Sequence, residues 1–288
     1  MPPMQRHDMS VKRFKIYDTG YCTHPGCMVE RGLGFDSKKF PALAILLELE
    51  DGRKILFDTG YSDHFLAATK KLPEKLYALA TPASPSALVL KLAADGISPE
   101  EISTIILSHF HADHISGVKD FPRASLVCDR GGYEKLKETP RFRQVMKGFL
   151  SNLLPVDFEQ RILWVERYPL ALSMILGVKL EHELYACSVP ELGGYLVSLP
   201  GHAAGHIGLL FRCLENWVFL CADAFWTERN LADHLPNRLT HLIMDDAQAY
   251  KRTLDSLSCI QRSLGSSISL ICSHESSVAT RFPDIEQA

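Results

Sequence analysis

Residues 108–114 read Ser-His-Phe-His-Ala-Asp-His, and this stretch decides how the whole chain is interpreted. It follows directly on the apolar run at residues 104–107, which predicts a buried strand. Imidazole nitrogens and carboxylate oxygens are common ligands of divalent metal ions. The first two imidazoles can point the same way from an extended segment, whereas the carboxylate and the third imidazole enter the following turn. The stretch therefore predicts a loop that serves two metal ions, with the candidate ligands His109, His111, Asp113 and His114.

Further candidate ligands follow other apolar runs of the strand type. Three such runs, at residues 195–199, 217–221 and 268–272, are followed by His202, Asp223 and His274. Each residue alone is unremarkable, but three in one repeated context favour a common explanation. His206 would enter the next strand, so we interpret it as a supporting residue. Asp58 follows a fourth strand pattern, where a plain turn is the alternative.

The rest of the chain alternates short apolar runs with helical patterns, which indicates an α/β protein. Asp51-Gly52 lies between two strand patterns and predicts a hairpin. No linker rich in Pro, Gly or Ser divides the chain, so we expect one domain over residues 1–288. We interpret the polar and aromatic segment 139–183 as a helical insertion or lid. Helices are expected at residues 66–79, 86–95, 131–138 and 246–264.

Composition excludes several classes of protein. The chain has 31 Lys and Arg against 34 Asp and Glu, so its charge gives no reason to expect nucleic acid as a partner. No window of 18 apolar residues predicts a membrane span, and the first residues lack the apolar core of a secretory signal. The eight Cys form no C-x-x-C pair, so we expect free thiols and a cytoplasmic location.

The motifs D-T-G, H-x-H-x-D-H, P-G-H-x-x-G-H, A-D-A and a late S-H-E stand in this order between residues 14 and 275. Together they resemble the metallo-β-lactamase fold hydrolases. The resemblance implies an αβ/βα four-layer sandwich with a dinuclear site along the edge between two sheets. It places His109, His111 and His202 on one metal, and Asp113, His114 and His274 on the other. Asp223 would bridge the two metals, and Asp58 would orient a ligand imidazole.

A dinuclear centre of this kind implies a metal-dependent hydrolase. Two divalent ions lower the pKa of a bridging water and polarise a carbonyl or phosphoryl oxygen. Asp113 is expected to orient the hydroxide and to carry its proton to the leaving group. The ligands favour zinc, and iron and manganese suit the same set.

Within the superfamily, residues 222–231 and the opening at residues 17–26 look most like the N-acyl homoserine lactonases. Asp223 disfavours true β-lactamases, which lack the bridging carboxylate. Diiron flavoproteins carry Glu at the place of His111. We therefore expect a small substrate with a lactone or a related carboxylic ester. A thioesterase or phosphodiesterase of the same fold, and a non-catalytic ligand sensor that binds metal, remain alternatives.

Two features depart from that branch. Trp226 stands where lactonases usually carry a Tyr whose hydroxyl assists the substrate carbonyl. The stretch between His114 and His202 is also long, and its extra length falls in segment 139–183. We expect apolar residues of this segment to cover the metals and to receive an acyl group; a homodimer surface or extra core is the alternative. The candidate substrate contacts are Trp226, Phe149, Leu153, Phe158 and, in the N-terminal loop, His24.

Overall fold

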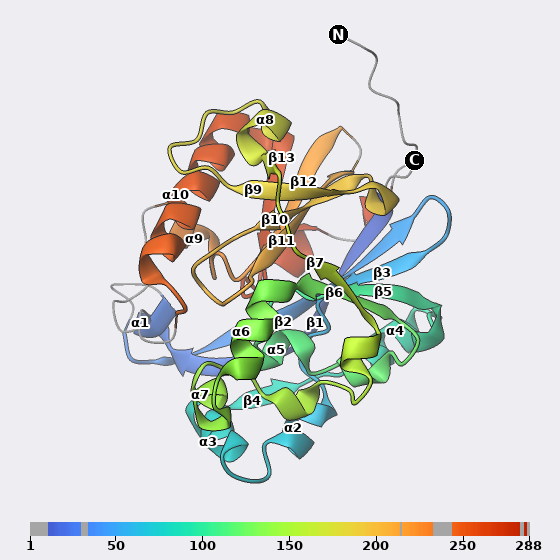
Figure 1. The fold of residues 1–288 in the computed structure, drawn as a ribbon, viewed down its shortest axis with the longest axis vertical. Helices are drawn as coiled ribbons and strands as arrows, with labels where there is room; N and C mark the ends of the chain where they lie inside the picture. Colours follow the sequence, from blue (N-terminus) through green and yellow to red (C-terminus); the bar gives the residue numbers. More distant parts are fainter. Residues whose placement is uncertain (1–10, 30–33, 214, 233–243, 283–284, 287–288) are drawn as a thin grey trace.

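The computed structural model describes residues 11–29, 34–213, 215–232, 244–282 and 285–286. Figure 1 shows two β-sheets with helices on their outer sides. In the first sheet the strand order is β14-β1-β2-β3-β5-β6-β7, with β4 paired to β1, and in the second it is β13-β12-β11-β10-β9-β8. This is the four-layer sandwich that the motifs imply.

The first sheet consists of β1 (Val11–Pro25), β2 (Ser37–Leu49), β3 (Lys54–Phe57), β4 (Ala83–Pro85), β5 (Ile102–Ile106), β6 (Ser125–Asp129), β7 (Ile162–Val165) and β14 (Ile285–Glu286). The second sheet consists of β8 (Leu170–Ala171), β9 (Tyr185–Val189), β10 (Gly194–Ser198), β11 (Ile207–Cys213), β12 (Asn216–Ala222) and β13 (Ile268–Cys272). The helices are α1 (Gly26–Val29), α2 (Asp63–Ala68), α3 (Glu74–Ala80), α4 (Leu88–Ala94), α5 (Ala112–Ile115), α6 (Arg130–Glu138), α7 (Arg141–Met146), α8 (Leu172–Leu176), α9 (Glu228–Leu231), α10 (Ala247–Leu264) and α11 (Val278–Arg281). Among the described residues, no helix combines the length and the apolar character needed to cross a bilayer.

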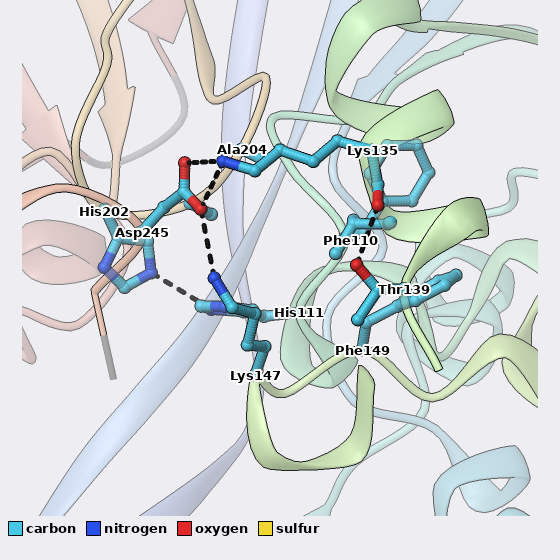
Figure 2. A pocket seen from close by; sticks show the side chains of 11 residues that line it. Phe110, His111, Lys135, Thr139, Lys147, Phe149, His202, Ala204 and Asp245 are labelled. Carbon is cyan, nitrogen blue, oxygen red and sulfur yellow. Dashed lines mark hydrogen bonds and ion pairs between the residues drawn. The ribbon is translucent and has the colours of Figure 1, made fainter. Parts of the chain in front are cut away.

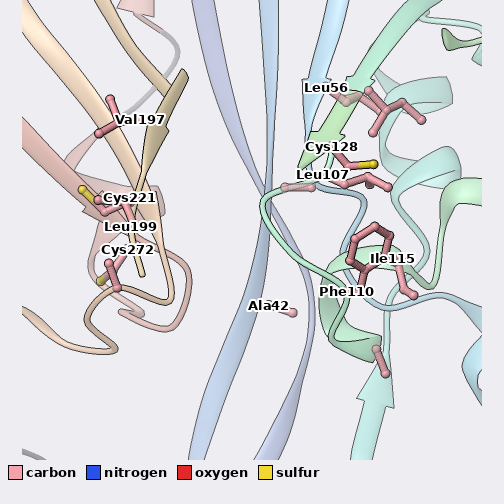
Figure 3. Close-up of a cluster of buried hydrophobic side chains, with 14 of the residues drawn as sticks. Ala42, Leu56, Leu107, Phe110, Ile115, Cys128, Val197, Leu199, Cys221 and Cys272 are labelled. Atoms are coloured by element: carbon pink, nitrogen blue, oxygen red, sulfur yellow. The ribbon is translucent and has the colours of Figure 1, made fainter. Parts of the chain in front are cut away.

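Strand β2 shows how the layers are held together. Side chains alternate between the faces of a strand, and both faces of β2 are apolar and buried. Leu43 and Ile45 belong to the core between the sheets, whereas Ala42 and Ala44 belong to the outer core. Between the sheets, the ring of Phe14 on β1 meets Phe211 on β11 edge to face, with centroids 5.9 Å apart. Figure 3 shows outer-core side chains on both sides of the central strands, Val197 and Cys221 on one side and Leu56 and Cys128 on the other.

Several sequence predictions are confirmed. β2 and β3 form the hairpin around Asp51-Gly52, and α10 begins after Asp246, whose side chain accepts from the backbone N–H groups of Gln248 and Ala249. The single helix expected at residues 66–79 is wrong: it is two helices, α2 and α3, with Pro73 before the second. Proline fixes its own φ and lacks a backbone N–H, so the first helix cannot continue through it.

The description of segment 139–183 as a helical insertion holds only in part. It contains the short helices α7 and α8, but β7 adds to the first sheet in parallel with β6, and β8 pairs with β9 of the second. The segment is thus the crossover that joins the two sheets. The four residues of β7 carry too short an apolar run to be told from helix by periodicity.

Candidate metal centre

The loop after β5 presents two imidazoles and then turns into α5. His111 is the extended residue that precedes this helix, with φ −68° and ψ 153°. Its ring and that of His109 have centroids 4.4 Å apart. Asp113 and His114 occupy the first turn of α5. One loop thus presents its four candidate ligands from an extended part and a helical part, as the sequence predicts.

Three more side chains reach the same place from strand ends of the second sheet. His202 follows β10, Asp223 follows β12 and His274 follows β13. Asp223 Oδ2 lies 3.2 Å from His202 Nε2 and 3.0 Å from His274 Nε2, and its Oδ1 lies 3.2 Å from His114 Nε2. The side chains form two groups whose ligand atoms lie within 4.8 Å of one another: His109, His111, His202 and Asp223 in one, and Asp113, His114, Asp223 and His274 in the other. Asp223 is the member that both groups share.

Unusual backbone conformations hold these groups in place. Asp58 and Ala222 have φ values of 60° and 46°, which residues other than Gly rarely adopt. Ala222 directly precedes Asp223. Gly201 has a φ of 129°, and a Cβ there would lie 2.1 Å from the backbone nitrogen of Tyr250. Only glycine therefore allows α10 to approach the turn that carries His202.

The ring nitrogens show that a cation fits this space. His114 Nδ1 donates to Asp58 Oδ2 at 2.7 Å, His274 Nδ1 donates to the carbonyl of Pro41 at 2.6 Å, and His109 Nδ1 donates to Ser108 Oγ at 3.0 Å. Their Nε2 lone pairs therefore face inward. In the described part of the chain, His109 Nε2, His114 Nε2 and Asp223 Oδ1 are buried without a hydrogen-bond partner. Acceptors that converge in this way need either added protons or metal ions between them.

The electrostatics of the site agree with this description. Burial lowers the pKa of His109 and His111 well below the ordinary value, and the neighbouring imidazoles lower it further. Burial also disfavours the protonated forms of His114 and His274, but nearby carboxylates outweigh it. They raise the pKa of His114 well above its usual range and that of His274 to about 9. The metal-free site therefore holds protons where divalent cations would displace them.

Asp58 lies behind the ligands, as the resemblance implies. It is fully buried, and besides His114 it accepts from the backbone N–H and the hydroxyl of Ser108, at 2.8 and 2.7 Å. His206 is in neither ligand group. Its Nδ1 donates to the carbonyl of Leu199 at 3.0 Å, and its ring packs against that of His109 with centroids 5.0 Å apart. Both residues contact the site from behind.

A cavity of about 320 Å³ opens over the two groups. The candidate ligands Asp113 and Asp223 form part of its wall, and Trp226 and His24 also line it. The Trp226 ring meets that of His202 at right angles, with centroids 5.8 Å apart. The remaining lining is largely apolar: Cys22, Met28, Phe40, Tyr61, Leu76, Tyr77, Ala80, Thr81, Val145, Met146, Lys147 and Gly148.

The structure places Phe149, Leu153 and Phe158, which the sequence predicts as substrate contacts, in the core rather than at this cavity, and Phe149 also lines a smaller cleft beside His111 and His202. All three are buried in the hydrophobic core, and none lines this cavity. Phe149 and Phe158 both pack against the ring of Phe110, with centroids 5.8 and 6.0 Å apart. Of the alternatives, extra core describes these three side chains. The crossover contributes Val145 to Gly148 to the cavity instead.

The sequence interpretation did not identify Tyr61 or Lys147 as part of the site. Tyr61 directly follows the D-T-G motif, which is the only local signal for it; its hydroxyl is buried beside the Cys22 thiol and has no hydrogen-bond partner among the described residues. Lys147 lines this cavity and also a smaller cleft beside His111 and His202. Figure 2 shows Lys135 and Lys147 both reaching Asp245 at that cleft, with distances of 2.7 and 3.1 Å.

Comparisons with known proteins agree with this geometry. The family model described as Metallo-beta-lactamase superfamily matches residues 38–258. An N-acyl homoserine lactonase of Bacillus cereus is 26% identical over 236 residues, which cover 79% of this chain and 82% of the relative. N-acyl homoserine lactonase AiiB of Agrobacterium fabrum is 27% identical and covers 75% of this chain and 74% of its own length. A solved N-acyl homoserine lactone hydrolase, with N-hexanoyl-L-homoserine bound at its catalytic metal centre, superposes with a TM-score of 0.67 at 21% identity, over 95% of this chain and 97% of that one.

Proposed function

Because this chain belongs to the metallo-β-lactamase superfamily, we propose that it is a dinuclear metal-dependent hydrolase that opens a lactone or cleaves a related carboxylic ester. The observation that carries the proposal is the shared position of Asp223, whose two oxygens face imidazoles of both ligand groups. A carboxylate in that position suits two cations held a few ångströms apart. The lactonase relatives favour the substrate class.

Two divalent cations, which we propose to be zinc, would supply hydroxide at neutral pH and polarise the carbonyl oxygen of the substrate. The residues named in the two ligand groups would hold them. Asp58 fixes the Nδ1–H tautomer of His114 and so keeps the Nε2 lone pair directed at the site. The carbonyl of Pro41 does the same for His274.

Asp113 is the residue that we assign to proton transfer. Its Oδ2 lies 3.6 Å from His114 Nε2 and 3.5 Å from His274 Nε2, and the side chain lines the cavity. From this place the carboxylate can accept a proton from the attacking water and donate it to the leaving alkoxide. Trp226 and Tyr61 line the cavity and would form the wall against which the acyl part of the substrate lies. The buried Tyr61 hydroxyl is a donor for a substrate oxygen, a role that Trp226 cannot fill with the same reach.

The test is hydrolysis of lactones, carboxylic esters, thioesters and phosphodiesters by the metal-loaded protein and by an Asp113→Asn variant. We expect turnover of lactones or esters, and a loss of 100-fold or more in kcat for the variant, on the order of the general acid–base contribution. Asp120→Asn is the matched control, because Asp120 pairs with His64 Nε2 at 2.9 Å outside both ligand groups. Full activity of the Asp113→Asn protein would contradict the mechanism, and turnover of only phosphodiesters would contradict the substrate class.

A further inference from the structure

Two short helices beside the cavity carry apolar side chains that no described residue covers. On α3 and the turn before it, Leu72 is 67% exposed and Leu79 is 68% exposed. On α7, Phe142 is 56% exposed and Met146 is 60% exposed. Large apolar side chains gathered on one surface mark a site of interaction. We call Leu72, Leu76, Leu79, Phe142 and Met146 the apolar collar.

The collar is continuous with the mouth of the cavity. α3 and α7 lie side by side at one end of the molecule in Figure 1, and Arg141 Nε at the start of α7 donates to Glu74 Oε1 at the start of α3 at 2.8 Å. Leu76 and Met146 are exposed on the surface and also line the metal cavity. Through these two residues the collar borders the mouth of the cavity, whereas Leu72, Leu79 and Phe142 lie outside its lining.

Basic residues accompany the collar. Residues 69–81 contain three Lys and one Glu, and that Glu is the buried partner of Arg141. Residues 139–147 contain two Arg and one Lys and no acidic residue, and of these Arg141 pairs with Glu74 and Lys147 with Asp245. The three Lys of residues 69–81 and Arg143 therefore give the collar an excess of positive charge, although the net charge of the whole chain is −3.

We propose that the apolar collar docks on an anionic lipid surface. Exposed Leu, Phe and Met flanked by Lys and Arg is the pattern of helices that lie in a membrane interface, where apolar side chains enter the acyl boundary and basic ones meet anionic headgroups. A second copy of the chain fits poorly, since a two-fold contact through the collar would bring like charges together. A protein partner there would also close the cavity, whereas a bilayer presents to its mouth the acyl-bearing molecules dissolved in it. This inference goes beyond the proposed function, because the collar contains no metal ligand.

Vesicle flotation tests the proposal directly. We expect the full chain to float with phosphatidylcholine vesicles that contain one third phosphatidylglycerol, to bind pure phosphatidylcholine much less, and to bind less as salt is raised. A Lys70→Gln, Lys71→Gln, Lys75→Gln variant should lose roughly 100-fold in partition coefficient, because each charge near such a surface contributes about fivefold. A Leu79→Ser, Phe142→Ser variant should lose at least about tenfold.

Matched controls lie elsewhere on the surface. A Leu90→Ser, Met174→Ser variant removes exposed apolar side chains from α4 and α8, and a Lys179→Gln, Arg262→Gln variant removes exposed charges near α8 and α10. Both should bind vesicles like the unmodified chain.

Absence of flotation at low salt, or equal losses in the collar and control variants, would overturn the proposal. Sedimentation velocity on the same proteins adds a second check: a dimer that Leu79→Ser, Phe142→Ser dissociates, together with no vesicle binding, would assign the collar to self-association. Hydrolysis of a short, water-soluble ester should be unchanged in the collar variants. A failure of the proposed hydrolase activity is therefore distinguishable from a failure of vesicle binding.

Discussion

Replacement of Asp58 by Asn should weaken metal binding although Asp58 is not itself a ligand. The carboxylate is fully buried and accepts three hydrogen bonds, one from His114 Nδ1 and two from Ser108. Asn has nearly the same shape but no charge, and its amide NH2 can only donate. With Asn present, His114 is free to carry its proton on Nε2, where it blocks the lone pair that faces the site.

The size of the effect follows from the contact that is lost. The 2.7 Å bond between His114 Nδ1 and Asp58 Oδ2 is charge-assisted and dry, and such a bond contributes about 1.5–3 kcal/mol. Since about 1.4 kcal/mol corresponds to a factor of ten, zinc affinity should fall roughly 10- to 100-fold. A fall of the same order is expected in kcat/KM at limiting metal.

Competition with a chromophoric chelator measures the affinity without reference to activity. Asp120→Asn is the control here too, because it removes a carboxylate that pairs with an imidazole, His64, away from the ligands. If Asp58→Asn and Asp120→Asn bind zinc equally well, Asp58 does not set the tautomer of His114 and the argument fails. Circular dichroism spectra and thermal melts of both variants show whether each is folded, so that a loss of zinc affinity is not mistaken for unfolding.

Further predictions concern other parts of the site and its surroundings. Chelation of the metals should lower the Tm by several degrees, because a cation that binds only the folded chain adds to its stability, and readdition of zinc should restore it; an unchanged Tm would argue against a preformed site. Tyr61→Phe should reduce kcat/KM several-fold with little change in Tm, since its hydroxyl has no partner among the described residues, and an unaltered kcat/KM would remove it from substrate binding. Gly148→Ala should weaken metal binding and stability together: Gly148 has a φ of 76°, and a Cβ there would lie 2.9 Å from His111 Cδ2. Asp245→Asn should lower the Tm at pH 7 but not in acid. Burial alone raises the pKa of Asp245, but the ammonium groups of Lys135 and Lys147 outweigh burial and hold this pKa below its usual value. A carboxyl group with a lowered pKa stabilises the fold above about pH 4, and this stabilisation is lost as the pH falls through the lowered pKa. A Tm difference that persists in strong acid would therefore contradict a stabilising ion pair between Asp245 and the two Lys.

Much of the fold and the grouping of the candidate metal ligands could be predicted because they are encoded locally. The run that ends at Leu107 predicts a buried strand, and the residues that follow it carry their own ligand spacing. The same holds for His202, Asp223 and His274, each of which follows an apolar strand. The order of these motifs along the chain then favoured one family over the others. Local encoding does not extend to β1, where charged and apolar residues do not alternate strictly from Lys12 to Asp18, since Lys12 and Arg13 are adjacent and so are Ile16 and Tyr17.

The cavity wall could not be predicted, because it depends on contacts between distant segments. Phe149 and Leu153 look like lid residues in the sequence, yet their burial is decided by packing against the core around Phe110. Tyr61 and Met146 belong to segments far apart in the chain, and only the fold brings them to one cavity. Short strands such as β7 are likewise determined by the neighbouring strand with which they pair.

The division of the metal ligands between the two sheets has a consequence for sequence variation. Four candidate ligands come from the first half of the chain and three from the second, so neither half holds a complete pair of ligand groups. Metal–ligand distances tolerate only about 0.2 Å. A small rotation of one sheet against the other therefore changes every distance between the halves at once. Substitutions in the core between the sheets, such as at Phe14 or Phe211, would then change metal affinity although they lie outside the ligand groups. Related sequences that bind both metals would therefore have to preserve the relative orientation of the two sheets.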